Sequence, residues 1–233
     1  MHIPFGLLTA GRDLTEPKIS PDGQTVAFVQ RWRSAAAIMT VPVEGGAERV
    51  MSTGPDPAHG RGIGGGCFDW HPDGTGVVYA ASDGELWWQP IGGRPEPITD
   101  IGRECRAPSI AGSVVAFIID EAEVWEVQLG SGALRRLDDG ADAFCFDPEL
   151  APDSSTVVWQ GWSPPAMPWD AAALVTCALA DETCERWRPE GAAVQQPRFT
   201  SAGNIAMVHD ASGWLNVYVD DKPVLAEPFE QAG

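Results

Sequence analysis

Short apolar runs recur along the whole chain, and a cluster of turn-forming residues separates each run from the next. The runs are rich in β-branched and aromatic residues and lie at 26–29, 77–79, 114–117, 157–159 and 205–208. Such runs predict short strands that are buried on both faces. The chain contains 26 glycines and 20 prolines among its 233 residues, and helical periodicity is nearly absent. The pattern therefore predicts an all-β fold.

A turn motif precedes these runs at regular intervals. The residues expected to form its three clear copies are Pro21, Asp22, Gly23, Pro72, Asp73, Gly74, Pro152 and Asp153, and degenerate copies lie at Ala111 and Ser201. Proline fixes φ at the first central position, aspartate caps the turn through its carboxylate, and glycine accepts positive φ. The copies lie 51, 39, 41 and 49 residues apart. This spacing averages about 45 residues, the length of one four-stranded propeller blade.

The repeat predicts a β-propeller of four-stranded antiparallel blades, five of which lie in this chain. Residues 1–15 are expected to lead into the propeller, which occupies 16–233. The expected blades are 16–52, 66–100, 105–138, 144–188 and 195–227. A closed ring of five blades fits the length, because propellers of four to eight blades exist.

One segment conflicts with this register. Residues 170–182 are rich in alanine, and Asp170 could cap a helix there. The repeat register places the third strand of the fourth blade in the same segment. We therefore predict a strand through residues 174–176 instead of a helix.

The charge balance narrows the choice of partners. The chain has 33 acidic and 15 basic side chains, which gives a net charge of −18. This field repels phosphate backbones and anionic lipid headgroups, so neither nucleic acid nor a membrane surface is an expected partner. No apolar run reaches membrane-span length, and the first twelve residues lack the basic start of a secretion signal. We expect a cytoplasmic protein, and the sequence leaves a homo-oligomer open.

The five cysteines are odd in number and scattered, which favours reduced thiols. Cys177 and Cys184 would face each other only across a hairpin centred on Ala180 and Asp181, and a disulfide there is the less favoured reading. No metal or other cofactor is expected, because Cys-x-x-Cys pairs are absent and the histidines are dispersed. The acidic stretch at 138–142 lacks calcium-loop spacing and is read as a solvated loop.

Tryptophan is frequent in the predicted strands, and most of these side chains are expected to pack in the core. The residues assigned to packing are Trp32, Trp70, Trp87, Trp125, Trp159, Trp187 and Trp214.

Two segments carry a family resemblance. Residues 162–170 read Trp-Ser-Pro-Pro-Ala-Met-Pro-Trp-Asp, and residues 212–218 read Ser-Gly-Trp-Leu-Asn-Val-Tyr. Both resemble the propeller domain of the prolyl oligopeptidase family of serine peptidases, in its acylaminoacyl-peptidase and dipeptidyl-peptidase-like branch. The chain departs from that pattern at Ser163, where the family usually has histidine, and at Leu215, where it has tryptophan.

The resemblance implies a propeller of seven or eight blades that caps an α/β-hydrolase domain and admits short peptides. We therefore expect an incomplete, open ring. The hydrolase nucleophile would lie in Gly-x-Ser-x-Gly, which does not occur in this sequence. The expected function is that of a noncatalytic propeller segment that gates peptide access to, and scaffolds, a hydrolase domain outside this chain. The candidate substrate or interdomain contacts are Trp162, Met167, Trp169 and Asp170.

The sequence also allows other interpretations of the 161–170 segment and of the function. The segment at 161–170 could pack between blades instead of facing a partner. The chain could be a free-standing binding propeller similar to the periplasmic propeller of the Tol system, which also uses Pro-Asp-Gly turns. A lactonase-type propeller enzyme would need carboxylates and histidines that converge on a central metal.

Overall fold

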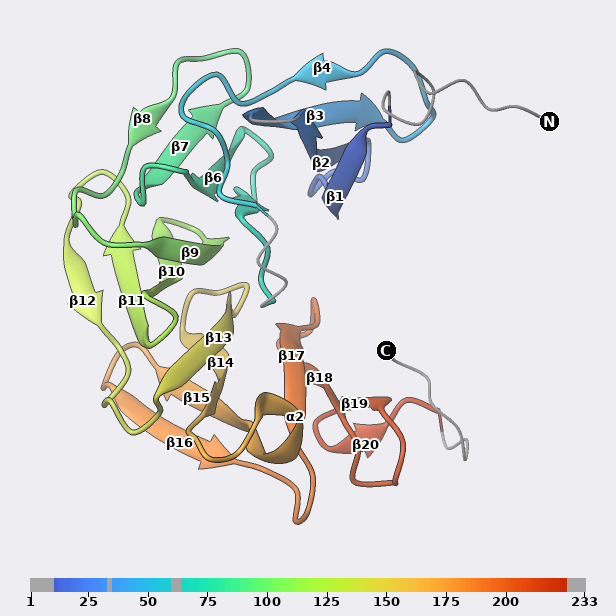
Figure 1. The fold of residues 1–233 in the computed structure, drawn as a ribbon, viewed down its shortest axis with the longest axis vertical. Coiled ribbons are helices and arrows are strands. Elements are labelled where there is room, and N and C mark those ends of the chain that lie inside the picture. The colour runs from blue at the N-terminus through green and yellow to red at the C-terminus, as the bar shows by residue number, and fades with distance from the viewer. Residues whose placement is uncertain (1–10, 33–34, 60–63, 226–233) are drawn as a thin grey trace.

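Five four-stranded antiparallel sheets make up the fold in the computed structural model, which describes residues 11–32, 35–59 and 64–225. In each sheet the four strands follow one another in chain order. Figure 1 shows the sheets as blades arranged around a common axis, with the ring open between the first and last blades. The predicted all-β propeller with an open ring is confirmed.

The strands are short, as the apolar runs predicted. The first blade contains β1 (Asp13–Ile19), β2 (Thr25–Trp32), β3 (Ala35–Pro42) and β4 (Arg49–Val50). The second contains β5 (Phe68–Trp70), β6 (Gly76–Ala80), β7 (Leu86–Pro90) and β8 (Glu96–Pro97). The third contains β9 (Cys105–Ala111), β10 (Val114–Ile119), β11 (Glu123–Gln128) and β12 (Leu134–Arg136).

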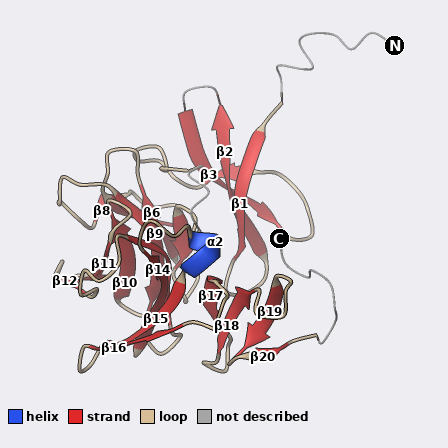
Figure 2. Cartoon of the chain, turned by 60° about the horizontal axis from the view of Figure 1, so that its bottom comes forward, coloured by secondary structure: helices blue, strands red, loops and turns tan. Residues whose placement is uncertain are grey.

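The fourth blade contains β13 (Phe144–Leu150), β14 (Thr156–Trp162), β15 (Ala173–Ala178) and β16 (Thr183–Trp187). The fifth contains β17 (Val194–Phe199), β18 (Ile205–His209), β19 (Asn216–Val219) and β20 (Lys222–Pro223). One short helix, α2 (Pro168–Ala171), lies among the described residues, between β14 and β15 (Figure 2). The strand through 174–176 is therefore confirmed. No described helix is long and apolar enough to span a membrane.

The motif turns connect the first and second strands of a blade. The Asp22 carboxylate accepts the Ser20 hydroxyl at 2.6 Å and the Gln24 N–H at 3.0 Å. Asp73 and Asp153 make the corresponding bonds to Thr75 and Ser155. Gly23 and Gly74 have φ of 70° and 73°, which explains the glycine in both copies.

Apolar side chains fill the space between consecutive blades. Four clusters of buried residues lie between blades one and two, two and three, three and four, and four and five. The end of the inner strand contributes to each cluster, because Trp70, Ile110 and Leu150 are buried against the preceding blade and Phe199 is partly buried there. Ile19 holds the same position in the first blade and is 64% exposed. Among the described residues, the open ring thus leaves no preceding blade to cover this apolar side chain.

Four inner strands share a bulge that the sequence analysis did not identify. A residue with positive φ precedes a proline in the pairs Glu16-Pro17, Ala107-Pro108, Asp147-Pro148 and Gln196-Pro197. At each pair the register between the inner strand and the second strand shifts. Such bulges bend a strand and redirect the following side chain. The signal was present in the sequence as an X-Pro pair whose proline lies three or four residues before four of the five turn copies.

The cysteine prediction was wrong for one pair. Cys177 and Cys184 form a disulfide between β15 and β16, whereas Cys67, Cys105 and Cys145 are free and buried. The hairpin pairs the two cysteines directly, with its centre at Ala180 and Asp181. From the sequence, a disulfide here needs a hairpin centred on Ala180 and Asp181. Only the pairing of β15 with β16 shows that this hairpin forms.

Candidate functional site

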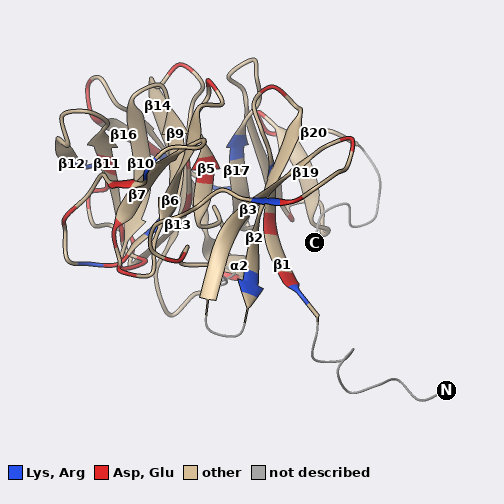
Figure 3. Cartoon of the chain, turned by 90° about the horizontal axis from the view of Figure 1, so that it is seen from above, with Lys and Arg blue, Asp and Glu red and all other residues tan. Residues whose placement is uncertain are grey.

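The ring has two faces with different loops. All inner strands run in the same direction around the axis, so the motif turns gather on one face, the turn face. Loops that join the second and third strands of each blade gather on the opposite face, the insertion face, which also carries α2. Acidic residues lie mainly in loops at both ends of the strands (Figure 3).

The four candidate contact residues occupy different environments on the insertion face. Trp162 is only 6% exposed, because it stacks on Phe144 and meets the edge of Phe146. Met167 and Trp169 are exposed, and Trp169 is 59% accessible. The Asp170 carboxylate accepts the Met167 N–H at 3.2 Å and so caps α2. Met167 and Trp169 therefore present exposed apolar side chains, whereas Trp162 is packed inside and the exposed Asp170 caps the helix.

Two more tryptophans on this face are exposed, which corrects the prediction that they pack in the core. Trp32 ends β2, and Trp214 lies in the loop between β18 and β19. Trp32 thus lies directly before, and Trp214 within, a connection between the second and third strands of a blade, which is the connection that contains α2 in blade four. We call Trp32, Met167, Trp169 and Trp214 the aromatic rim. The rim comes from blades one, four and five, and blades one and five border the open side of the ring. The sequence offered one signal for the exposure of Trp32 and Trp214, which is their position directly before or within the loop between the second and third strands.

Charged side chains from the inner strands form a second candidate site near the axis, the axial cluster: Lys18, Asp69, Asp147, Glu149 and Arg198. Lys18 Nζ lies 3.0 Å from Asp69 Oδ1, which joins the first and second blades. Arg198 Nη1 lies 2.7 Å from Asp147 Oδ1, which joins the fourth and fifth. Asp69 also accepts the Ile110 N–H at 3.1 Å. The cluster ties neighbouring blades together at the ring axis.

The axial carboxylates are strongly affected by burial. The Asp147 side chain is 1% exposed, and its Oδ2 atom has no hydrogen-bond partner among the described residues. Burial raises the pKa of Asp147 despite the opposing effect of Arg198. Burial, followed by repulsion from Asp69, raises the pKa of Glu149 to about 7. The axis therefore carries a carboxyl group that titrates near neutral pH.

In the acidic stretch at 138–142, the Asp138 and Asp142 carboxylates bind other groups of the protein. Asp138 accepts the Val124 N–H at 2.7 Å and pairs with Arg136, and Asp142 pairs with Arg186. Among the residues that the structure describes, no group of three or more His, Cys, Asp or Glu side chains could hold a metal ion.

Two open cavities lie on opposite faces. One of about 620 Å³ lies on the turn face between the first two blades and is lined in part by Arg49, Met51, Trp70 and Ile91. The other, of about 400 Å³, lies on the insertion face beside Asp56, His59 and Arg106. The Gly-x-Ser-x-Gly motif of a serine hydrolase is absent from the sequence, so neither cavity contains that nucleophile.

No protein-family model and no curated protein matches the sequence. Solved structures do resemble the fold. A puromycin-hydrolyzing peptidase from Mycobacterium tuberculosis superposes with a TM-score of 0.74 at 18% identity, over 94% of this chain and 38% of the peptidase. A putative TolB from Agrobacterium tumefaciens has a TM-score of 0.62 at 19% identity, over 74% of this chain and 64% of its own. An oligogalacturonate lyase in complex with manganese has a TM-score of 0.64 at 12% identity, over 89% of this chain and 59% of its own.

This chain thus spans less than two thirds of each of these proteins. At such low identities the similarity concerns the fold alone, and it extends to a peptidase, a TolB protein and a lyase. The chain is therefore a β-propeller of the architecture that these proteins share.

Proposed function

We propose that this chain is the noncatalytic propeller part of a serine peptidase of the prolyl oligopeptidase family. In this role it gates peptide access to an α/β-hydrolase domain and provides the scaffold on which that domain docks. The similarity to the propeller of a puromycin-hydrolyzing peptidase, over 94% of this chain, supports the proposal. The absence of a Gly-x-Ser-x-Gly motif supports the assignment of chemistry to another domain.

The aromatic rim is the single observation that carries the docking role. Three tryptophans and a methionine are exposed on one face of the ring. Large aromatic side chains are enriched where protein interfaces form, because they bury much apolar area at little entropic cost. A domain docked on the insertion face would bury these side chains.

The docking role can be tested with the purified chain and a fluorophosphonate probe, which labels the nucleophile of serine hydrolases. We expect no labelling of this chain. We expect a labelled α/β-hydrolase to co-purify with the wild-type chain from its own cells. Trp169→Ala and Trp214→Ala should weaken this capture at least roughly tenfold, as loss of about 1.4 kcal/mol at a hot spot would do.

The matched control is Ile91→Ala, because Ile91 is equally exposed but lies on the turn face. Equal capture by the wild type and the rim variants would contradict the docking role. Labelling of this chain itself would contradict the noncatalytic assignment.

A free-standing binding propeller is the second candidate, and the similarity to a putative TolB favours it. Under this candidate the chain would be recovered without a labelled hydrolase and would bind its ligand alone.

A further inference from the structure

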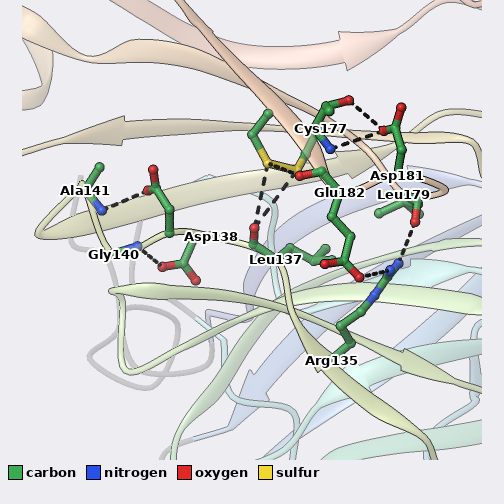
Figure 4. Close-up of a disulfide and its surroundings, with 12 residues drawn as sticks. Arg135, Leu137, Asp138, Gly140, Ala141, Cys177, Leu179, Asp181 and Glu182 are labelled. Carbon is green, nitrogen blue, oxygen red and sulfur yellow. Dashed lines mark hydrogen bonds and ion pairs between the residues drawn. A yellow bond between two sulfur atoms is a disulfide. The ribbon is translucent and has the colours of Figure 1, made fainter.

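The Cys177–Cys184 disulfide lies in the outer hairpin of the fourth blade, at the boundary with the third (Figure 4). Cys177 is buried in β15, whereas Cys184 is exposed in β16. The sulfur atoms face the Leu137 carbonyl oxygen of the third blade, at 4.0 and 3.8 Å. A reducing agent can therefore reach the bond from the Cys184 side.

β16, the strand that carries Cys184, makes few apolar contacts that would hold it against the blade. β16 is an edge strand, and nearly all of its residues are exposed. Its buried apolar contribution is confined to Trp187, which is partly buried against the cluster between blades four and five. Exposed edge strands with few apolar contacts open locally at low free-energy cost. The covalent link to β15 opposes such opening.

Contacts at both ends of β16 connect it to other parts of the molecule. Arg135 of the third blade donates to the Glu182 carboxylate and the Leu179 carbonyl oxygen, both at 3.0 Å, as Figure 4 shows. Two residues beyond Cys184, Arg186 forms an ion pair with Asp142. Arg186 thereby fixes a buried carboxylate in the connection between the third and fourth blades.

Asp142 contacts the start of the insertion that contains the rim residues Met167 and Trp169. Its carboxylate packs against Gly161, where any side chain would collide with it. Arg186 also reaches the Gly161 carbonyl oxygen at 3.5 Å. In the same connection, the Ala143 N–H donates to the Ser163 hydroxyl at 2.9 Å. Gly161 and Ser163 flank Trp162, so these bonds anchor the start of the segment that contains Met167 and Trp169.

We propose that the Cys177–Cys184 disulfide is a redox-sensitive clasp that holds the 163–170 insertion in position through Arg186 and Asp142. The regulatory meaning of the clasp rests on the proposed docking function of the aromatic rim. Reduction requires a dithiol, such as a thioredoxin-type protein. The S–S bond accepts two electrons, the two cysteines take up two protons as thiols, and the dithiol becomes a disulfide. β16 then loosens, and the Arg186–Asp142 pair loses its support.

Hydrogen exchange with mass spectrometry on the isolated chain tests the clasp without any partner. Dithiothreitol should speed exchange in 179–187 by about tenfold, which corresponds to about 1.4 kcal/mol of local opening free energy. Exchange in 161–170 should rise with it, and peptides of the first two blades should not change. The double variant Cys177→Ser, Cys184→Ser should show the faster exchange without reductant and no response to dithiothreitol.

Two single variants separate the steps. Arg186→Ala should speed exchange in 161–170 while alkylation still finds the disulfide intact. Arg188→Ala is its control, because Arg188 is exposed nearby and forms none of the ion pairs found among the described residues. Cys105→Ser should keep the wild-type response, because Cys105 is a free thiol in another blade interface.

The clasp is overturned if alkylation under non-reducing conditions finds both thiols free. It is also overturned if reduction leaves exchange in 161–170 unchanged. The exchange measurement uses this chain alone. Failure to find a hydrolase partner would therefore contradict the proposed function without contradicting the clasp.

Discussion

Arg198 on the inner strand of the fifth blade lies 2.7 Å from Asp147 on the inner strand of the fourth, in an ion pair whose carboxylate is 1% exposed. The bulge at Asp147-Pro148 turns this carboxylate toward the next blade. The pair joins the fourth and fifth blades near the axis. It illustrates how the inner strands combine apolar packing between blades with ionic contacts near the axis.

Removing the cation of this pair should destabilise the fold strongly. Arg198→Met leaves the buried Asp147 carboxylate without its counter-charge, and we expect a loss of about 3–5 kcal/mol in the free energy of unfolding. Urea denaturation followed by tryptophan fluorescence measures this loss. The exposed Arg188→Met is the control and should stay within about 0.5 kcal/mol of wild type. A loss below about 1 kcal/mol in Arg198→Met would mean that the pair contributes little.

Stability should depend on pH through Glu149. Its pKa is about 7 in the folded chain and near the ordinary value of 4.5 when unfolded. The folded state therefore binds this proton more tightly, and the contribution of Glu149 to stability decreases as pH rises from about 4.5 to 7. The decrease can reach about 3 kcal/mol. Glu149→Gln should remove it, so that the variant is more stable than wild type at pH 8.

Denaturation of both proteins at pH 5 and pH 8 measures the difference. Glu185→Gln removes an exposed carboxylate on β16 and should keep the wild-type pH profile. A Glu149→Gln variant with the same pH dependence as wild type would place the titrating group elsewhere.

Equivalent residues of different blades should respond differently to truncation. Leu150→Ala removes a side chain buried against the third blade and should cost about 2–5 kcal/mol. Ile19→Ala removes the side chain at the same blade position, but it is exposed, so the change should stay within about 0.5 kcal/mol. Thermal unfolding of both variants checks the comparison. A large loss in Ile19→Ala would show that another part of the chain covers this residue.

The tryptophans should separate into two classes. Trp159 is 2% exposed in the cluster between blades three and four, and Trp159→Ala should cost about 3–5 kcal/mol. Trp169→Ala should leave stability within about 0.5 kcal/mol and alter only partner or peptide binding. Chemical denaturation measures the first effect and the capture experiment the second. Equal destabilisation by both changes would place Trp169 in the packing instead of the rim.

The order of strands was readable from the sequence because it depends on local chemistry. A proline, an aspartate that caps its own turn, and a glycine with positive φ define a turn within a few residues, and the apolar run after it defines a strand. The blade repeat, and not local propensity, located the strand in the alanine-rich segment, where α2 includes only Asp170 and Ala171. The bulges also have a local signal, because each contains an X-Pro pair that can be found in the sequence.

The site depended on relations between blades. Trp159 and Trp214 both lie in or beside strands, yet one is buried and the other exposed, because exposure depends on which side chains the neighbouring blade presents. Lys18 and Asp69 are 51 residues apart in the chain and 3.0 Å apart at the axis. The disulfide likewise required the register of one hairpin. The sequence by itself determined the turns, the strands and the blade repeat, since these form from neighbouring residues. Only the tertiary structure decided the aromatic rim, the axial cluster and the clasp, because burial and charge pairing arise from blades that are distant in the chain.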